Sequence, residues 1–170
     1  MKKALVVVDF QNDFVNGSFG FDRAKTLRTP IVEKIKNALE NGVDLIFTMD
    51  THNSDYLETS EGKALPIEHC INGSWGWELD DSILPYKEKG VVIEKPTFGS
   101  LELAKLLRDK GYDEVEFCGL VTSICVLSNA ILAKTYLPNA KIVVDSKATE
   151  DATCKENALA CLKMVQVEVI

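Results

Sequence analysis

The stretch V-E-F-C-G-L-V-T-S-I-C-V-L-S-N-A at residues 115–130 joins an apolar run to a helical pattern. Residues 114–118 are typical of a buried strand, residues 119–122 of a tight turn, and the residues from Ser123 onward of a helix. Cys125 then falls in the first turn of the helix, where free backbone N–H groups and the helix dipole favour a thiolate. The stretch therefore predicts a strand-to-helix unit with a reactive sulfur near its junction.

The same alternation of strand and helix patterns runs outward from this stretch in both directions. The predicted strands cover residues 4–8, 43–49, 91–94, 114–118, 140–145 and 165–170, and the predicted helices cover residues 29–40, 100–110, 123–135 and 151–164. Apolar runs separated by amphipathic helices predict an α/β fold, a doubly wound, mainly parallel six-stranded sheet with helices on both faces. We expect one domain over residues 1–170, with a functional loop between Asp50 and Gly90.

The composition limits the classes of partner. Of the 170 residues, 46% are hydrophobic and 26% are charged, and the net charge is −7. This balance is typical of a globular protein and argues against nucleic acid or an anionic membrane as a partner. Five cysteines without a C-x-x-C pair argue against a disulfide framework. We expect a cytoplasmic protein that binds a small molecule and forms a homo-oligomer, since dimers are the commonest assembly.

Two further polar residues lie at the ends of predicted strands, just as Cys125 follows the predicted strand 114–118. Asp9 ends A-L-V-V-V-D, and Lys95 ends V-V-I-E-K. Asp9 could take the proton of the Cys125 thiol, and Lys95 could lower the pKa of that thiol by its charge. Each residue also has a simpler interpretation, as a core cysteine, a capping aspartate and a solvated lysine. The combination favours a cysteine hydrolase, with backbone N–H groups of residues 119–122 facing a developing oxyanion.

The segment F-T-M-D-T-H at residues 47–52 suggests a metal site. In an extended segment Asp50 and His52 lie on the same side, and His69 follows in the same long connection. One carboxylate and two imidazoles suit a catalytic zinc or iron ion, and Glu58 could add a fourth ligand. The alternative is that the two histidines are ordinary loop residues.

The sequence resembles the isochorismatase-like cysteine hydrolases, and within them the nicotinamidase/pyrazinamidase group. The matching pieces are V-V-D-F-Q-N-D-F (7–14), F-T-M-D-T-H (47–52), P-I-E-H-C-I-N-G-S-W-G (66–76), E-K-P-T-F-G-S (94–100) and G-L-V-T-S-I-C-V (119–126). The pieces occur in the order of the family and span most of the chain. The resemblance implies a three-layer sandwich related to the Rossmann fold.

The resemblance also implies roles for individual residues. It implies catalytic Asp9, Lys95 and Cys125, an oxyanion hole from the Val121 and Cys125 amides beside a cis Leu120–Val121 peptide, metal ligands Asp50, His52 and His69 with Glu58 at a variable fourth position, and substrate contacts from Phe14 and Leu120. The expected cofactor is one divalent metal ion, zinc first, with iron and manganese as alternatives.

The implied activity is the hydrolysis of nicotinamide to nicotinate and ammonia through a thioester. Pro66 departs from the group, which commonly carries an aromatic residue at this position, and Trp75 or Trp77 could supply the missing ring. Two alternatives follow, a hydrolase of another small carboxamide or carbamoyl compound, and a non-catalytic binding protein on the same fold.

Overall fold

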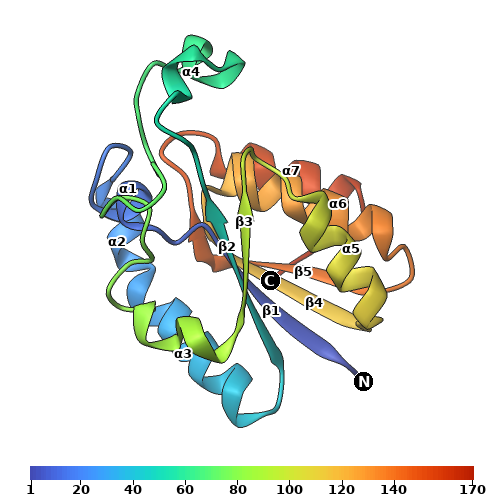
Figure 1. The fold of residues 1–170 in the computed structure, drawn as a ribbon. Coiled ribbons are helices and arrows are strands. Elements are labelled where there is room, and N and C mark those ends of the chain that lie inside the picture. Colours follow the sequence, from blue (N-terminus) through green and yellow to red (C-terminus); the bar gives the residue numbers. More distant parts are fainter.

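A computed structural model describes all residues from 1 to 170 and contains one six-stranded sheet in which all pairings are parallel (Figure 1). The strand order is β3-β2-β1-β4-β5-β6. The strands are β1 (Lys3–Val8), β2 (Asp44–Asp50), β3 (Val91–Lys95), β4 (Glu114–Leu120), β5 (Lys141–Glu150) and β6 (Glu168–Val169). The predicted α/β class and six-stranded doubly wound sheet are confirmed.

Helices lie on both sides of the sheet (Figure 1). They are α1 (Asn12–Val15), α2 (Asp22–Thr26), α3 (Arg28–Glu40), α4 (Ser60–Ala64), α5 (Leu101–Lys110), α6 (Leu127–Tyr136) and α7 (Lys155–Met164). Two 3₁₀ helices, Tyr56–Glu58 and Leu84–Lys89, and a π-helix, Thr122–Val126, complete the elements. None of these helices combines the length and apolar character needed to cross a bilayer.

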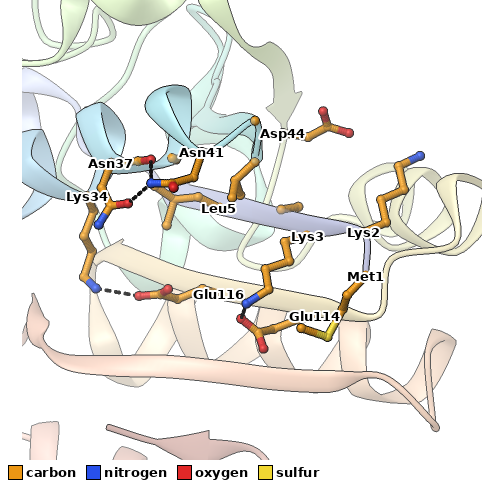
Figure 2. Close-up of a pocket in the computed structure, with 14 residues that line it drawn as sticks. Met1, Lys2, Lys3, Leu5, Lys34, Asn37, Asn41, Asp44, Glu114 and Glu116 are labelled. Atoms are coloured by element: carbon orange, nitrogen blue, oxygen red, sulfur yellow. Dashed lines mark hydrogen bonds and ion pairs between the residues drawn. The ribbon is translucent and has the colours of Figure 1, made fainter.

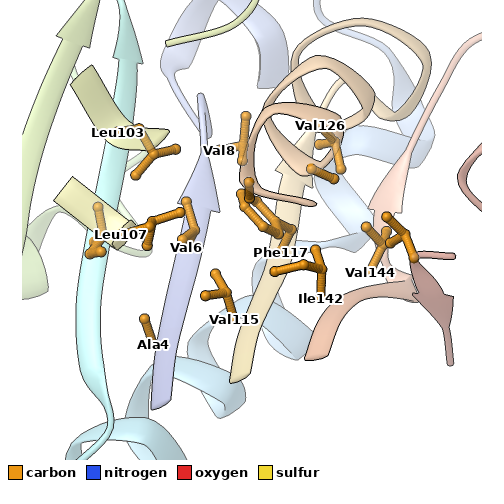
Figure 3. Close-up of a cluster of buried hydrophobic side chains, with 14 of the residues drawn as sticks. Ala4, Val6, Val8, Leu103, Leu107, Val115, Phe117, Val126, Ile142 and Val144 are labelled. Carbon is orange, nitrogen blue, oxygen red and sulfur yellow. The ribbon is translucent and has the colours of Figure 1, made fainter. Parts of the chain in front are cut away.

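Strand β1 divides the core into two layers. Ala4, Val6 and Val8 pack with side chains of α5, α6 and α7 (Figure 3). Leu5 and Val7 point to the opposite face and pack with side chains of α2 and α3. Successive side chains of a strand alternate between faces, so β1 is buried on both. This burial explains why the strand reads as an unbroken apolar run.

Helix α5 follows its local sequence signals. The Ser100 hydroxyl accepts a hydrogen bond from the Leu103 N–H at 3.0 Å and caps the first turn. Gly111 ends the helix in the left-handed conformation, with φ of 66°. The predicted helix is therefore confirmed, together with both of the residues predicted to bound it.

Elsewhere the structure differs from the predicted elements. The connection between β2 and β3 contains α4 and both 3₁₀ helices, and α1 and α2 lie where the sequence pattern predicts no element. Helix α7 begins at Lys155 and not at Asp151, because the Asp151 carboxylate accepts hydrogen bonds from the Thr153 and Cys154 N–H groups and holds a turn there. The last strand, predicted over residues 165–170, contains only the two residues of β6.

Strand β4 extends two residues beyond its predicted end and includes Gly119 and Leu120. The expected tight turn at 119–122 is therefore wrong, because Leu120 still pairs with Glu150 of β5. Gly119 has φ of 108°, and a Cβ there would lie 2.1 Å from the carbonyl oxygen of Val8. Only glycine permits this approach of β4 to β1.

Candidate active site

Four neighbouring strands bring polar side chains to the same edge of the sheet. Asp9 follows β1, while Asp50 and Lys95 end β2 and β3 and are partners in the parallel register. Cys125 follows β4 in the π-helix. The strand order reverses between β1 and β4, and in doubly wound sheets ligands bind at the carboxyl ends of strands around such a point.

Lys95 is the centre of a buried cluster. Its Nζ lies 2.7 Å from Asp9 Oδ2, 3.4 Å from Asp50 Oδ1 and 3.5 Å from Cys125 Sγ. It also donates a hydrogen bond to the Thr97 carbonyl at 2.9 Å. Lys95 is 1% exposed, and Asp9 is completely buried. The structure thus brings together the acid, the amine and the thiol that the sequence singles out.

Burial and charge together set the protonation of this cluster. Burial by itself lowers the pKa of Lys95, but Asp9, Cys125 and Asp50 raise it above the ordinary value, so the amine stays charged. Burial, followed by the negative charge of Asp9, raises the pKa of the Cys125 thiol well above 9.0, while Lys95 acts in the opposite direction. Desolvation of the sulfur and the facing carboxylate therefore act against a thiolate, in the opposite direction to the helix dipole and to Lys95.

The two oxygens of Asp9 have different surroundings. Oδ1 accepts a hydrogen bond from the Thr48 hydroxyl at 2.6 Å. Oδ2 accepts no hydrogen bond of suitable angle, although Lys95 Nζ forms an ion pair with it. Burial raises the pKa of Asp9, and Lys95 opposes this effect. Oδ2 is therefore the oxygen available to receive a proton.

The nucleophile segment begins with a cis peptide between Leu120 and Val121. Val121 lines the cavity in front of Cys125. Leu120 does not: it is completely buried and packs in the core with residues of α2 and α3. The expected substrate contact from Leu120 is therefore wrong, because as the last residue of β4 it points into the sheet's core.

Asp50, His52 and His69 form a second buried group whose possible ligand atoms all lie within 4.8 Å of one another. Asp50 Oδ2 lies 3.1 Å from His52 Nε2 and 3.4 Å from His69 Nε2. Burial acts to raise the pKa of Asp50, but hydrogen bonds with both histidines hold it below the ordinary value. His69 Nδ1 lies 2.9 Å from the Ile67 carbonyl, which leaves Nε2 for the group.

This donor set fits a divalent metal ion. One carboxylate and two imidazoles suit zinc, iron or manganese, and three protein ligands leave positions open for other ligands. Asp50 also contacts Lys95 through its other oxygen, Oδ1. We call Asp50, His52 and His69 the metal group, and Lys95 with Asp9 and Cys125 the thiol cluster. The carboxylate of Asp50 joins the two.

Glu58 lies outside this group. It ends the 3₁₀ turn Tyr56–Glu58, in which Tyr56 takes the inward position and Glu58 is exposed. The acid beside the histidines is Glu61, whose Oε1 lies 3.9 Å from His52 Nε2. Thr59 caps α4 and puts Glu61 in its first turn, and this capping residue is the sequence signal that could have identified Glu61.

A cavity of about 260 Å³ joins the two groups. Cys125 and Asp50 line it together with His69. Its other lining residues are mostly apolar and comprise Phe14, Phe19, Phe21, Leu65, Phe98, Val121 and Ile124, with Glu61, Ser123, Asp151, Ala152 and Thr153. The lining contains no lysine or arginine, so the cavity suits a small, neutral and largely apolar ligand.

Neither tryptophan replaces the aromatic residue absent at Pro66. Trp75 is 62% exposed, and the Trp77 indole N–H donates to the Thr51 hydroxyl. The ring of Phe19 lines the cavity and lies edge-on to the ring of His69, with 4.7 Å between centroids. Sequence reasoning missed Phe19 because it belongs to a different segment from the histidine.

A larger hollow of about 720 Å³ lies at the opposite, amino-terminal edge of the sheet. Figure 2 shows that its charged side chains face one another, with Lys34 toward Glu116 and Lys3 toward Glu114. These charges are already paired, and neither the thiol nor the metal group lines the hollow. The candidate nucleophile and two of the three candidate metal ligands therefore line the smaller cavity and not this hollow.

Comparisons with known proteins agree with the fold. The Isochorismatase domain family matches residues 3–170. A crystal structure of nicotinamidase/pyrazinamidase from Bacillus subtilis is similar with a TM-score of 0.88 and 30% identity, over 99% of each chain. N-carbamoylsarcosine amidase from Thermoplasma acidophilum is similar with a TM-score of 0.83 and 26% identity, over 99% of this chain and 95% of the other.

A curated relative has a different substrate in its name. Ureidoacrylate amidohydrolase from Acinetobacter baylyi is 31% identical over 155 residues, which cover 74% of this chain and 62% of the relative. The chain thus spans less than two thirds of the length of that protein. These relatives agree on the hydrolysis of amides and differ in the amide.

Proposed function

The chain belongs to the isochorismatase family, and we propose that it is a metal-dependent amidohydrolase that converts nicotinamide to nicotinate and ammonia. One observation carries the proposal: the thiol of Cys125 and the group of Asp50, His52 and His69 lie on the same small cavity, and Lys95 and Asp9 contact the thiol side. A nucleophile, a proton acceptor and a ring-orienting site are the parts that this hydrolysis requires.

The charge of the cavity favours nicotinamide among the amides named for the relatives. Ureidoacrylate and N-carbamoylsarcosine both carry a carboxylate, which would need a cationic side chain in addition to the metal ion. Besides His69, the lining offers three acids, Asp50, Glu61 and Asp151, and no lysine or arginine. Four phenylalanines provide apolar walls suited to a flat aromatic ring. A neutral heteroaromatic carboxamide therefore fits best.

In the proposed first step, the Cys125 thiol gives its proton to Asp9 Oδ2 as the sulfur attacks the carboxamide carbon. The backbone N–H groups of Val121 and Cys125 donate to the oxyanion that forms. As the carbon–nitrogen bond breaks, Asp9 passes the proton to the departing nitrogen. Ammonia leaves, and the acyl group remains on the sulfur as a thioester.

In the second step, Asp9 takes a proton from water as the water oxygen attacks the thioester carbon. The carbon–sulfur bond then breaks, the sulfur recovers a proton from Asp9, and nicotinate leaves after its acid ionises. Lys95 keeps its charge and stabilises whichever of Asp9 and the sulfur is anionic. A divalent metal held by Asp50, His52 and His69 would act as a Lewis acid for the pyridine nitrogen.

An ammonia-release assay on a panel of amides tests this proposal. We expect nicotinamide to be hydrolysed faster than ureidoacrylate and N-carbamoylsarcosine. Benzamide is the matched control, because it keeps the ring and the carboxamide but lacks the pyridine nitrogen, and we expect it to be slower than nicotinamide. Equal rates for benzamide and nicotinamide would contradict the proposed role of the metal group.

A second candidate keeps the same chemistry and changes the substrate to a small carbamoyl compound. The identity of 31% with ureidoacrylate amidohydrolase from Acinetobacter baylyi favours it, as does Pro66 at the position where nicotinamidases commonly carry an aromatic residue. Turnover of ureidoacrylate without turnover of nicotinamide in the same panel would select this candidate.

A further inference from the structure

Asn129 is a buried polar residue whose side chain connects two segments of the site. It lies on α6 and is 1% exposed. Its Nδ2 donates to the Cys125 carbonyl at 2.8 Å and to the Phe98 carbonyl at 3.1 Å, and its Oδ1 accepts from the Ser100 N–H at 2.9 Å. The amide thus joins the nucleophile segment to the segment that follows β3.

The partners of Asn129 determine how its amide is oriented. Two of them are carbonyl oxygens, which can only accept, and the third is an N–H group, which can only donate. The asparagine amide has two N–H donors and one carbonyl, so all three contacts are satisfied in one orientation. No other residue type of this size offers two donors and one acceptor in that arrangement.

The two segments joined in this way hold Lys95 and Cys125. Lys95 ends β3, an edge strand, whereas Cys125 follows β4, and β2 and β1 lie between those strands. The sheet hydrogen bonds therefore join the two strands only through two others. Lys95 also donates to the Thr97 carbonyl, directly before Phe98. Asn129 provides a short connection that bypasses the sheet.

Gly99 is an independent sign that this segment must lie close to α6. A Cβ at Gly99 would meet Leu132 Cδ1 at 2.8 Å and Ser128 Cβ at 3.4 Å. The Leu132 methyl ends a flexible side chain and can move, but both contacts show that the backbone between Phe98 and Ser100 lies close to the helix near Asn129. The close packing at Gly99 and the three hydrogen bonds of Asn129 therefore both hold the segment after β3 against α6.

We infer that Asn129 is a positioning residue, which holds the segment after Lys95 against the helix of Cys125 and so sets the distance between the amine and the thiol. The inference rests on the proposed function only in taking Cys125 as the nucleophile. It does not depend on which amide is the substrate.

The test is the alkylation of Cys125 by iodoacetamide at neutral pH, followed on the peptide that contains Cys125 by mass spectrometry. We expect Asn129→Leu, which keeps the volume and removes all three hydrogen bonds, to change the alkylation rate constant by roughly tenfold or more, because small displacements in a site have effects of this size. In turnover of the active amide, kcat should fall while KM stays within about twofold.

Ala133→Gly is the matched control. Ala133 is buried one turn after Asn129 in the same helix and takes no part in the three hydrogen bonds, so this variant weakens α6 without removing them. We expect it to lower the melting temperature and to leave the Cys125 alkylation rate unchanged. If Asn129→Leu does not fold, Asn129→Ala removes the same three hydrogen bonds without placing an apolar branch among them and should give the same change in alkylation.

The outcomes separate this inference from the proposed function. Parental alkylation of Cys125 in Asn129→Leu, or the same change in Ala133→Gly, would overturn the positioning role. A protein that does not hydrolyse nicotinamide, but whose Cys125 alkylation depends on Asn129, would overturn the proposed substrate and leave the positioning role standing.

Discussion

At the scale of single residues, the site is defined by one buried amine among several groups that can be anionic. Lys95 contacts Asp9, Asp50 and Cys125. One positive charge compensates the two carboxylates only in part, so a third negative charge on the sulfur is unfavourable at rest. Burial and these carboxylates therefore favour the protonated thiol, and Asp9 Oδ2 lies on the Lys95 side of the site, where it could accept the proton.

We predict that Cys125→Ala lowers turnover of the active amide by at least about 10⁴-fold, since the thioester can no longer form. The far-ultraviolet circular dichroism spectrum should be unchanged, because alanine fits the space of the thiol. Cys161→Ala is the control: Cys161 is exposed and does not line the cavity, and its variant should retain parental activity. Turnover near the parental rate in Cys125→Ala would exclude the proposed nucleophile.

A second prediction concerns the acids near the histidines. We predict that Glu61→Gln accelerates loss of a bound divalent metal to a chelator by about tenfold, because a charged group beside the ligands is removed. Glu58→Gln should leave this rate unchanged, since Glu58 is exposed and outside the group. Metal content after timed chelation measures both. A larger effect from Glu58→Gln would show that α4 packs differently.

At the scale of elements, the close approach of β4 to β1 determines where the segment that carries Cys125 starts. Strand β4 pairs with β1 up to Gly119 and with β5 up to Leu120, and the π-helix follows after Val121. The wider turn of a π-helix is common at functional sites. The position of Cys125 therefore depends on a close backbone contact earlier in the chain.

We predict that Gly119→Ala lowers the free energy of unfolding by more than about 2 kcal/mol, because the added Cβ would collide with the Val8 carbonyl in a strained conformation. Gly42→Ala is the matched control. Gly42 also has a positive φ, of 66°, but a Cβ there meets nothing within 4 Å. Gly42→Ala should lower the free energy of unfolding by about 1 kcal/mol, because alanine is strained in the left-handed backbone conformation.

Urea unfolding of the two variants measures the difference. Equal destabilisation of Gly119→Ala and Gly42→Ala would mean that the contact with Val8 relaxes freely. The same comparison can be read in activity, because displacement of β4 should also move Cys125.

At the scale of the whole molecule, Asp80 attaches the long connection to the body of the protein. Its side chain is 1% exposed and accepts hydrogen bonds from Arg28, the first residue of α3, at distances down to 2.8 Å. Burial raises the pKa of Asp80, but the hydrogen bonds from Arg28 and Ser82 outweigh it and hold the pKa below the ordinary 3.8. The carboxylate is thus favoured in the folded state.

The lowered pKa of Asp80 makes the stability of the fold depend on pH in one direction. A carboxyl group with a lowered pKa in the folded state stabilises the fold at pH values above its unfolded pKa and loses this contribution as the pH falls through the folded pKa. We predict that Asp80→Asn lowers the free energy of unfolding by roughly 2 kcal/mol at pH 7. The difference from the parent should shrink as the pH falls below about 4.

Urea unfolding at pH 7 and pH 3 measures this difference. Asp22→Asn is the control, because the Asp22 side chain is fully exposed and pairs only with Lys25 on the surface, so its stability should follow the parent at both values. A difference between Asp80→Asn and the parent that does not change with pH would show that the charge of Asp80 is not responsible.

Part of this molecule could be predicted from the sequence because the signals are local. Helix α5 is bounded by Ser100 and Gly111, which act on backbone groups within a few positions of themselves. Alternation of apolar runs and helices indicates a parallel sheet, and the strands of such a sheet end together. For that reason Asp9, Lys95 and Cys125 could be expected in one place.

The rest depended on how distant segments meet. The fold of the long connection decides that Glu61, and not Glu58, lies beside His52, and the packing of the segment after α1 puts the ring of Phe19 against His69. Pairing with β5 decides that Leu120 is core. The sequence by itself determined which chemical groups reach the edge of the sheet, since periodicity and strand order are written locally. The neighbours of these groups and the direction of their pKa shifts follow from the packed fold, because burial and charge depend on every segment around them.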